Sequence, residues 1–208
     1  MSVLAIVLAR TNSKGLKNKN IRFLDGKPLI YHTINLLKKS KMIDKIVVST
    51  DSIKIQKIAI RYGAEAPFLR PKKLSTDRTT TEKALKHSLL FVNKKMKFYP
   101  KIIMYVQITE PFRKLWMIEK CIKALKKNKK LDTSFMAKKF YKNIWKKKKN
   151  VFERITKEKY GLPRQTKKKY FREDTGIACA TRPKVILSEK RIGQKILPIY
   201  YEHDFDYL

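Results

Sequence analysis

Cysteines are rare in this chain, and long apolar runs are missing. Cys121 and Cys179 are the only cysteines, and their spacing matches no metal-binding motif. Both lie in apolar stretches, so we predict two buried, reduced thiols in a cytoplasmic protein. No stretch approaches the ~20 apolar residues of a membrane-spanning helix, and the short apolar start lacks the flanks of a signal peptide. We expect a single domain over residues 1–208 with no membrane partner.

Acidic residues are scarce. The chain has 17 Asp and Glu against 51 Lys and Arg, which gives a formal net charge of +34. Such a composition is typical of nucleic-acid-binding proteins. Here the cations are mostly lysines dispersed over nearly every expected helix and loop, and no RRM, KH or zinc-finger motif is present. We therefore expect only non-specific nucleic-acid binding at low salt, and we keep a basic nucleic-acid-binding protein as the alternative of a different class.

The commonest nucleotide-binding and catalytic motifs are also missing. The chain contains neither G-x-x-x-x-G-K-[ST] nor G-x-G-x-x-G, so it has no P-loop and no dinucleotide fingerprint. No Ser-His-Asp or Cys-His constellation can be recognised, and His32 lies inside an expected helix, where a structural role is favoured. The sequence therefore favours a direct displacement over a covalent intermediate.

An uncharged run, Val3–Leu8, is typical of a strand buried on both faces of a mainly parallel sheet. The loop after it combines cations with small residues, which together can form an anion site. Its cations are Arg10, Lys14, Lys17 and Lys19, and its small residues are Ser13 and Gly15. Open α/β sheets bind ligands at the carboxyl ends of their strands. We interpret the loop as a nucleotide triphosphate site, with a basic surface loop as the alternative.

Apolar patterns of strand and helix alternate along the rest of the chain. Expected strands cover residues 43–50, 101–107, 131–136 and 195–200, and expected helices cover 28–39, 52–62, 80–92 and 116–127, with a short one after Arg182. This order predicts an α/β three-layer sandwich with a mostly parallel central sheet. Asp51 is expected to cap the helix over 52–62, with metal or ribose binding as the alternative. Trp116 is expected on the apolar stripe of its helix.

Several ordered motifs resemble those of the CMP-sialic acid synthetases (acylneuraminate cytidylyltransferases). A-R-T-N-S-K-G-L-K-N-K-N-I resembles A-R-x-G-S-K-G-x-x-x-K-N, with Asn12 in place of glycine. L-D-G-K-P-L-I, V-V-S-T-D-S, Y-G-A-E-A-P-F-L-R-P and L-S-T-D follow in the family's order. The resemblance implies a nucleotide-diphospho-sugar transferase-like fold. It also implies a CTP-dependent enzyme that joins a nine-carbon ulosonic (sialic-type) acid to CMP and releases pyrophosphate. A Kdo-type cytidylyltransferase and an inactive relative, suggested by Asn12, Glu110 and Cys179, are the alternatives.

The resemblance also implies roles for individual residues. The catalytic cations that neutralise the triphosphate are Arg10, Lys14 and Lys19, and the nucleotide-binding residues are Arg10, Ser13, Lys14, Lys19, Asn20, Arg70 and Thr109. The residues expected to contact the sugar acid are Gln107, Arg164 and Gln165. Without the resemblance, Arg70 is a surface cation. Arg113 is expected either to bind phosphate or to face solvent.

Two further segments complete the interpretation. Asp204 and Asp206 share one side of an extended segment, and such carboxylates suit Mg²⁺. Because the resembling family has a D-I-D metal pair near this position, we predict an Mg²⁺ cofactor and favour it over the alternative of a solvated acidic end.

Residues 138–149 interleave cations with aromatics, which can stack on nucleic-acid bases. The resemblance implies instead a small dimerisation excursion over 138–172, and hence a homodimer.

Overall fold

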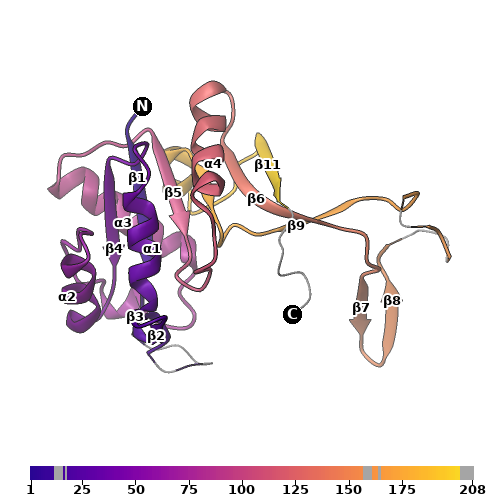
Figure 1. The fold of residues 1–208 in the computed structure, drawn as a ribbon, viewed down its shortest axis with the longest axis horizontal. Helices are drawn as coiled ribbons and strands as arrows, with labels where there is room; N and C mark the ends of the chain where they lie inside the picture. The colour runs from indigo at the N-terminus through magenta and orange to yellow at the C-terminus, as the bar shows by residue number, and fades with distance from the viewer. Residues whose placement is uncertain (12–15, 17, 157–160, 164, 202–208) are drawn as a thin grey trace.

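The structure, a computed structural model, describes residues 1–11, 16, 18–156, 161–163 and 165–201 (Figure 1). The described elements are, in chain order, β1 (Val3–Leu8), η1 (Lys19–Ile21), β2 (Phe23–Leu24), β3 (Lys27–Pro28), α1 (Leu29–Lys38), β4 (Lys45–Ser49), α2 (Ile53–Arg61), η2 (Lys72–Leu74), α3 (Thr81–Lys95), β5 (Ile102–Val106), α4 (Leu115–Lys127), β6 (Thr133–Phe140), β7 (Trp145–Lys148), β8 (Val151–Arg154), β9 (Tyr170–Glu173), β10 (Cys179–Thr181), α5 (Pro183–Leu187) and β11 (Ile196–Tyr201). Within these ranges no helix has both the length and the apolar character to cross a membrane.

A seven-stranded sheet forms the centre of the molecule. Its strand order is β11-β6-β10-β5-β1-β4, and β9 pairs with β6 off this path. β1 pairs in parallel with β4 and with β5, and β11 pairs in parallel with β6. β10 runs antiparallel to both of its neighbours. Consequently β1, β4, β5, β6 and β11 all end at one edge of the sheet, and the predicted mostly parallel sheet is confirmed.

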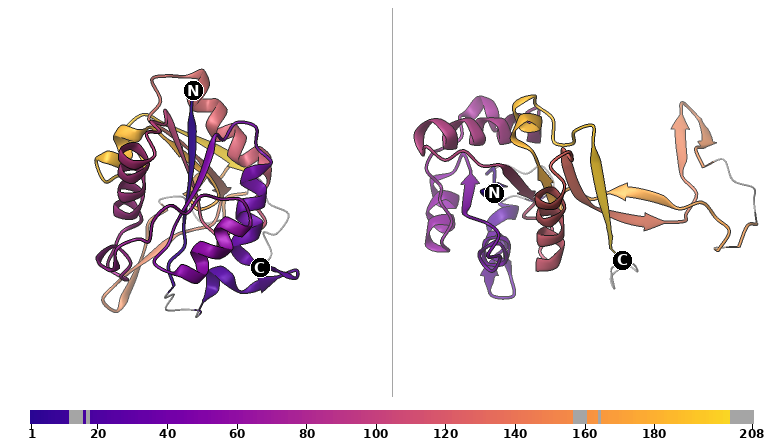
Figure 2. Two further views of the ribbon diagram at one scale, coloured as in Figure 1. Left: turned by 90° about the vertical axis from the view of Figure 1, so that its left-hand side faces the viewer. Right: turned by 90° about the horizontal axis from the view of Figure 1, so that it is seen from above.

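Helices cover both faces of this sheet, as Figure 2 shows. Alternate residues of β1 point to opposite faces: Val3, Ala5 and Val7 pack in one buried cluster, and Leu4 and Ile6 pack in another. The first cluster contains the buried sides of α1, α2 and α4, and the second contains those of α3 and α5. The predicted three-layer sandwich is therefore confirmed. A strand covered on both faces must be apolar throughout, which explains the uncharged run in β1.

One capping prediction is wrong. The side chain of Ser52, and not that of Asp51, caps α2 by accepting a hydrogen bond from the Ile55 amide at 3.3 Å. The Asp51 carboxylate instead accepts two hydrogen bonds from Thr11, one from its backbone N–H at 2.8 Å and one from its hydroxyl at 3.1 Å. Either residue can cap a helix start, so sequence alone did not decide between these neighbours.

Other differences concern unpredicted strands, boundaries and one exposed side chain. The sequence did not predict β10 or the short strands β2, β3, β7, β8 and β9. β6 starts at Thr133 and runs to Phe140, beyond the predicted 131–136, because its last residues pair with β9. α3 extends three residues past the predicted end at Val92. Trp116 is 39% exposed and lies under the ammonium of Lys120, 4.8 Å from the ring centroid. The two cysteines are free and buried, as predicted.

An arm projects from the sandwich beside β11 (Figure 1). The ends of β6 and β9 pair with each other outside the body, with Phe140 opposite Tyr170, and lead to the β7–β8 hairpin. The arm falls within the predicted excursion over 138–172. Its proposed part in a dimer remains a prediction.

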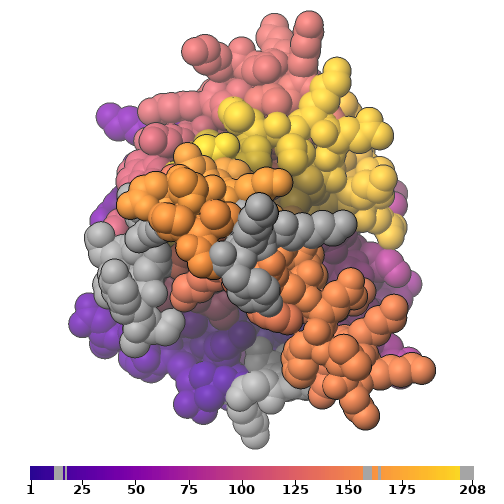
Figure 3. Space-filling view, turned by 90° about the vertical axis from the view of Figure 1, so that its right-hand side faces the viewer, coloured from indigo at the N-terminus to yellow at the C-terminus, as the bar shows by residue number. Residues whose placement is uncertain are grey.

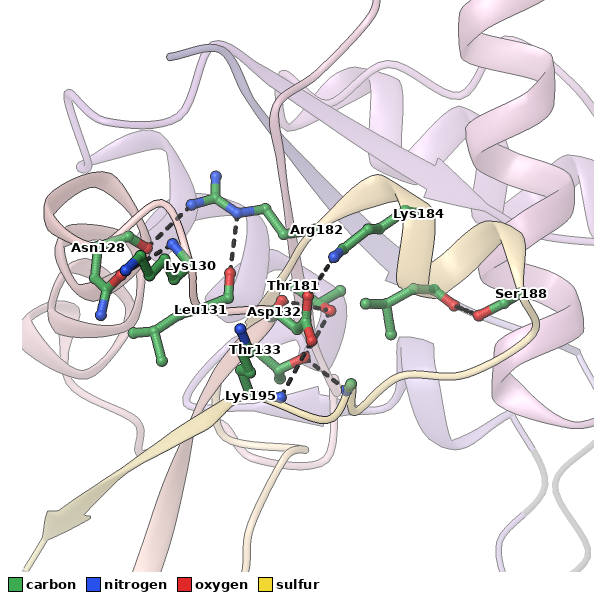
Figure 4. A network of polar contacts seen from close by, with 12 residues as sticks. Asn128, Lys130, Leu131, Asp132, Thr133, Thr181, Arg182, Lys184, Ser188 and Lys195 are labelled. Atoms are coloured by element: carbon green, nitrogen blue, oxygen red, sulfur yellow. Dashed lines mark hydrogen bonds and ion pairs between the residues drawn. The ribbon is translucent and has the colours of Figure 1, made fainter.

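A polar network lies at the edge of the sheet opposite to the edge where the parallel strands end (Figure 4). The guanidinium of Arg182, just before α5, donates to the carbonyl oxygens of Leu125 at 2.6 Å, Leu131 at 3.2 Å and Asn128 at 3.3 Å. Two of these carbonyls belong to the end of α4, where backbone oxygens lack helical partners. Partial burial lowers the pKa of Arg182, although Asp132 opposes this effect. Arg182 therefore fastens α4 to the end of β10.

We predict that Arg182→Met lowers the free energy of unfolding by roughly 2–4 kcal/mol, because it leaves several carbonyl oxygens without their donor. Urea denaturation measures this change. Lys184→Met is the matched control: it removes the 2.7 Å ion pair from Lys184, whose side chain is 74% exposed, to Asp132. That loss should cost less than about 1 kcal/mol. Equal losses in the two variants would contradict the role given to Arg182.

Candidate active site

A cavity of about 290 Å³ opens at the edge where the parallel strands end. It is lined by the loop after β1, by the segment between η2 and α3, and by the end of β5. Six residues predicted for nucleotide or sugar binding line it: Arg10, Lys19, Asn20, Arg70, Gln107 and Thr109. They come from segments far apart in the sequence, and parallel strand pairing brings their segments to one edge.

Three hydrogen bonds fasten the described ends of the loop after β1. The carboxylate of Asp51, from the loop after β4, holds Thr11 as described above. Asn20 is buried, and its side-chain amide donates to the carbonyl oxygen of Arg10 at 2.9 Å. The first residue before η1, Asn18, adopts a left-handed backbone conformation with φ of 56°. Lys19 is thereby held at the cavity from a fixed helical turn.

Arg10 and Asp77 form an ion pair across the cavity. The guanidinium Nη1 of Arg10 lies 2.6 Å from the Asp77 carboxylate, and the two side chains are 33% and 41% exposed. Such a partly exposed pair contributes little stability, so another anion can compete for the arginine. The sequence analysis predicted no role for Asp77, which is the last residue of the L-S-T-D motif.

Arg70 is buried, which argues against the alternative of a surface cation. Only 5% of the residue is exposed, and its Nε donates to the hydroxyl of Ser75 at 3.2 Å. Its backbone N–H donates to the Thr50 carbonyl at 2.7 Å, which fixes it beside the end of β4. Burial lowers the pKa of Arg70, and the nearby Asp51 carboxylate opposes this shift. A desolvated cation at a cavity wall is suited to binding an anion.

The end of β5 contributes the polar floor of the cavity. Tyr105 is 2% exposed, and burial raises the pKa of its hydroxyl, which therefore stays protonated. The Thr109 hydroxyl donates to the side-chain oxygen of Gln107 at 3.3 Å. Glu110, one of the residues that suggested an inactive relative, does not line the cavity. Threonines in the segment before α3 and at its first residue, for which the sequence predicted no role, add hydroxyls to the lining: Thr76, Thr79, Thr80 and Thr81.

Arg113 fits neither of the two alternatives that the sequence left open. It is 5% exposed, and it donates to Thr33 at 3.3 Å and to the main-chain oxygen of Gln107. Burial lowers its pKa to about 10. Arg113 therefore lies beneath the site and does not face solvent or line the cavity. The local sequence does not indicate this position, because two of its three partners, Thr33 and Gly176, come from α1 and from the segment before β10.

Some predicted residues are not brought to this cavity. Gln165 is exposed on the arm. Ser13, Lys14, Arg164, Asp204 and Asp206 lie outside the described residues, so their predicted roles stay predictions. Over the described ranges, no group of three or more His, Cys, Asp or Glu side chains could hold a metal ion. Among the described residues that line the cavity, Asp77 is the one carboxylate, beside the cations Arg10, Lys19 and Arg70.

The arrangement is chemically suited to a polyanion. Three cationic side chains, two from the loop after β1 and one from the segment before η2, surround a space that also presents hydroxyls and an amide. Hydrogen bonds between such cations and phosphate oxygens are stronger than neutral ones. No described nucleophile with an activating base lines the cavity, so the site is organised for binding, orientation and charge neutralisation.

Comparison with known proteins identifies relatives of this chain. A CMP-N,N'-diacetyllegionaminic acid synthase from Legionella pneumophila is 43% identical over 114 residues, which cover 55% of this chain and 49% of that protein. An N-acylneuraminate cytidylyltransferase from Streptococcus agalactiae is 39% identical over 124 residues, covering 59% of this chain and 29% of that protein. A pseudaminic acid cytidylyltransferase from Campylobacter jejuni is 37% identical over 99 residues, which cover 48% of this chain and 43% of that protein. The matched part of this chain thus spans about half or less of each of these relatives.

Solved structures share the fold. A CMP:2-keto-3-deoxy-manno-octonic acid synthetase in complex with CTP superposes with a TM-score of 0.70 at 14% identity, covering 97% of this chain and 91% of that one. A 4-diphosphocytidyl-2C-methyl-D-erythritol synthase superposes with a TM-score of 0.69 at 9% identity, covering 100% of this chain and 91% of that one. The family model described as cytidylyltransferase matches residues 4–202. The chain therefore belongs to the cytidylyltransferase family.

Proposed function

We propose that this protein is a CTP-dependent cytidylyltransferase that activates a nine-carbon, sialic-type sugar acid. The observation that carries the proposal is the cavity of about 290 Å³ lined by Arg10, Lys19 and Arg70. Family membership supports the choice of CTP, and the relatives named for legionaminic, neuraminic and pseudaminic acids support the sugar class. The matched relatives differ in the sugar that they are named for, so the particular sugar acid is the open part of the proposal.

In the proposed reaction the anomeric hydroxyl oxygen of the sugar acid forms a bond to the α-phosphorus of CTP. The bond from that phosphorus to the oxygen bridging to the β-phosphate breaks, the hydroxyl proton is lost, and pyrophosphate leaves. Such a transfer depends on positioning and charge neutralisation. Arg10, Lys14 and Lys19 would stabilise the triphosphate and the leaving pyrophosphate, with Arg10 exchanging Asp77 for a phosphate oxygen. Arg70, Ser13, Asn20 and Thr109 would orient the nucleotide.

The sugar acid would meet polar groups next to the nucleotide. Gln107 lines the cavity beside Thr109, and we propose that its side-chain amide contacts the sugar acid. Arg164 and Gln165 are proposed to contribute from the arm. Because Gln165 is exposed and does not line the cavity of its own chain, this contribution fits the site of a second copy.

Mg²⁺ is the proposed cofactor, held by Asp204 and Asp206. This pair follows β11, whose last residue pairs with Lys138 at the edge of the sheet that carries the cavity. Asp77, the carboxylate in the described lining, is engaged with Arg10, so the described residues do not themselves provide a site. When bound, Mg²⁺ would polarise a phosphate oxygen and neutralise charge.

We predict pyrophosphate release from CTP and Mg²⁺ with one member of a panel of sugar acids: N-acetylneuraminate, legionaminate, pseudaminate or Kdo. Release should stop when EDTA removes Mg²⁺. A coupled phosphate assay measures the rate. Release with Kdo alone would favour the eight-carbon alternative. A folded protein that binds none of CTP and the sugars would contradict the proposal.

We predict that Lys19→Ala lowers kcat/KM for CTP roughly 10- to 100-fold, the range expected when a hydrogen bond to a charged group is lost. Steady-state kinetics with varied CTP measures this. Lys54→Ala is the matched control, since it removes the same charge from an exposed position outside the cavity. If both variants lose activity equally, the effect comes from net charge and Lys19 does not belong to the site.

We infer that two copies associate through the arm. Large apolar side chains are exposed along it, with Val151 at 68%, Phe152 at 61% and Ile155 at 54%. Figure 3 looks onto this side of the molecule, where the arm stands in front of the body. Exposed apolar groups gathered on one projection are typical of an interaction surface.

Sedimentation analysis should therefore give a mass of about twice 24.6 kDa. The double variant Val151→Ser, Phe152→Ser should shift it toward the monomer, because the buried apolar contact is lost. Ile53→Ser, at an equally exposed apolar position on α2, is the control and should leave the mass unchanged. A monomeric wild-type protein would overturn the inference.

A further inference from the structure

Gln107 lies where three segments of the chain meet. Its backbone N–H donates to the carbonyl oxygen of Gly176 at 2.7 Å, which joins the end of β5 to the turn before β10. Its own carbonyl oxygen accepts a hydrogen bond from Nη2 of Arg113. The same Nη2 lies 3.4 Å from the Gly176 oxygen, and Nη1 donates to the hydroxyl of Thr33 on α1 at 3.3 Å. The Arg113 guanidinium thus links the backbone of Gln107 and the backbone of Gly176 to α1.

The side chain of Gln107 is confined as well. A Cβ atom added to Gly176 would lie 2.8 Å from Oε1 and 2.9 Å from Cδ of Gln107, closer than real Cβ contacts. The Gln107 amide therefore occupies the space that only a glycine leaves open. On its other side the Thr109 hydroxyl donates to Oε1 at 3.3 Å. Gly176 has no positive φ, so the missing Cβ is required for this close approach and not for backbone conformation.

Holding these backbone segments together with a buried guanidinium carries a desolvation cost. It is 5% exposed, its partners are three neutral oxygens, and among the described atoms its buried Nε has no hydrogen-bond partner. A buried cation without a contacting carboxylate costs desolvation energy that neutral acceptors only partly return. Burial lowers its pKa to about 10, and the Glu110 charge opposes that shift. The guanidinium therefore provides fixed geometry more than net stability.

We propose that Arg113 and Gly176 are positioning residues that set the Gln107 amide for the sugar acid. Neither lines the cavity; each acts through Gln107, Arg113 through the main chain and Gly176 through the space left for the side chain. They determine how well the sugar acid binds and leave the triphosphate cations untouched, because Arg10, Lys19 and Arg70 belong to other segments. The inference rests on the proposed function in assigning Gln107 to the sugar acid.

The experiment compares Arg113→Lys, Gly176→Ala, Gln107→Ala and the double variant Gly176→Ala, Gln107→Ala with the wild type. Lys120→Met is the control, since Lys120 contacts Trp116 on the surface of α4. Pyrophosphate release is measured against the concentration of the sugar acid, and CTP affinity by calorimetry. The side-chain amide resonances of Gln107 are followed in parallel by NMR, so its placement is read without turnover. If Arg113→Lys does not fold, Gly176→Ala still tests the placement of the Gln107 amide.

We expect Arg113→Lys and Gly176→Ala to raise KM for the sugar acid about 10-fold, as for a misplaced binding group, with CTP affinity within about twofold of wild type. Both should move the Gln107 amide resonances, and Lys120→Met should not. In the Gln107→Ala background, Gly176→Ala should have no further effect, because the group that it displaces is gone.

Three results would overturn the inference: unmoved Gln107 resonances in both variants, a KM effect of Gly176→Ala that persists without Gln107, or a loss of CTP affinity as large as the rise in KM. Failure of the proposed function gives a different pattern. In that case the wild type itself releases no pyrophosphate with any sugar acid, while the resonance shifts still report whether Arg113 and Gly176 place Gln107.

Discussion

The parallel pairing of β1 with β4 and β5 is the constraint on which the candidate site depends. Parallel strands end at the same edge, so the loops that follow them meet there whatever their separation in sequence. Arg10, Arg70 and Gln107 reach one cavity for this reason. Pairing holds only because helices cover both faces, which requires the apolar strands seen in β1 and β5, both almost wholly buried.

Two arginines near the site are buried for different purposes. Arg70 is 5% exposed and lines the cavity, so its desolvation strengthens its attraction for an anion. Arg113 is equally buried but lies beneath the floor, and its donors are occupied by backbone and hydroxyl oxygens. In a chain with a net charge of +34, most cations are solvated and individually contribute little. Burial therefore distinguishes Arg70 and Arg113 from most of the other cations of the chain.

Much of the fold and part of the site could be predicted from the sequence. The uncharged run of β1 and the alternation of strand and helix patterns predicted the three-layer sandwich, because burial on two faces leaves a local signature. Motif order placed Lys19, Asn20 and Thr109 among the ligand-binding candidates, and all three line the cavity. Their roles in binding remain proposals.

The sequence by itself determined the main helices and parallel strands, the three-layer arrangement and the loop rich in cations, since these follow from local apolar periodicity and turn-forming residues. It did not indicate the antiparallel strand β10. Only the tertiary structure decided that Asp51 holds Thr11, that Asp77 pairs with Arg10, and that Arg113 supports Gln107. Each of these contacts joins side chains or backbone from segments distant in sequence. Local patterns carry no information on such pairings, because they depend on how strand register and helix packing bring the segments together.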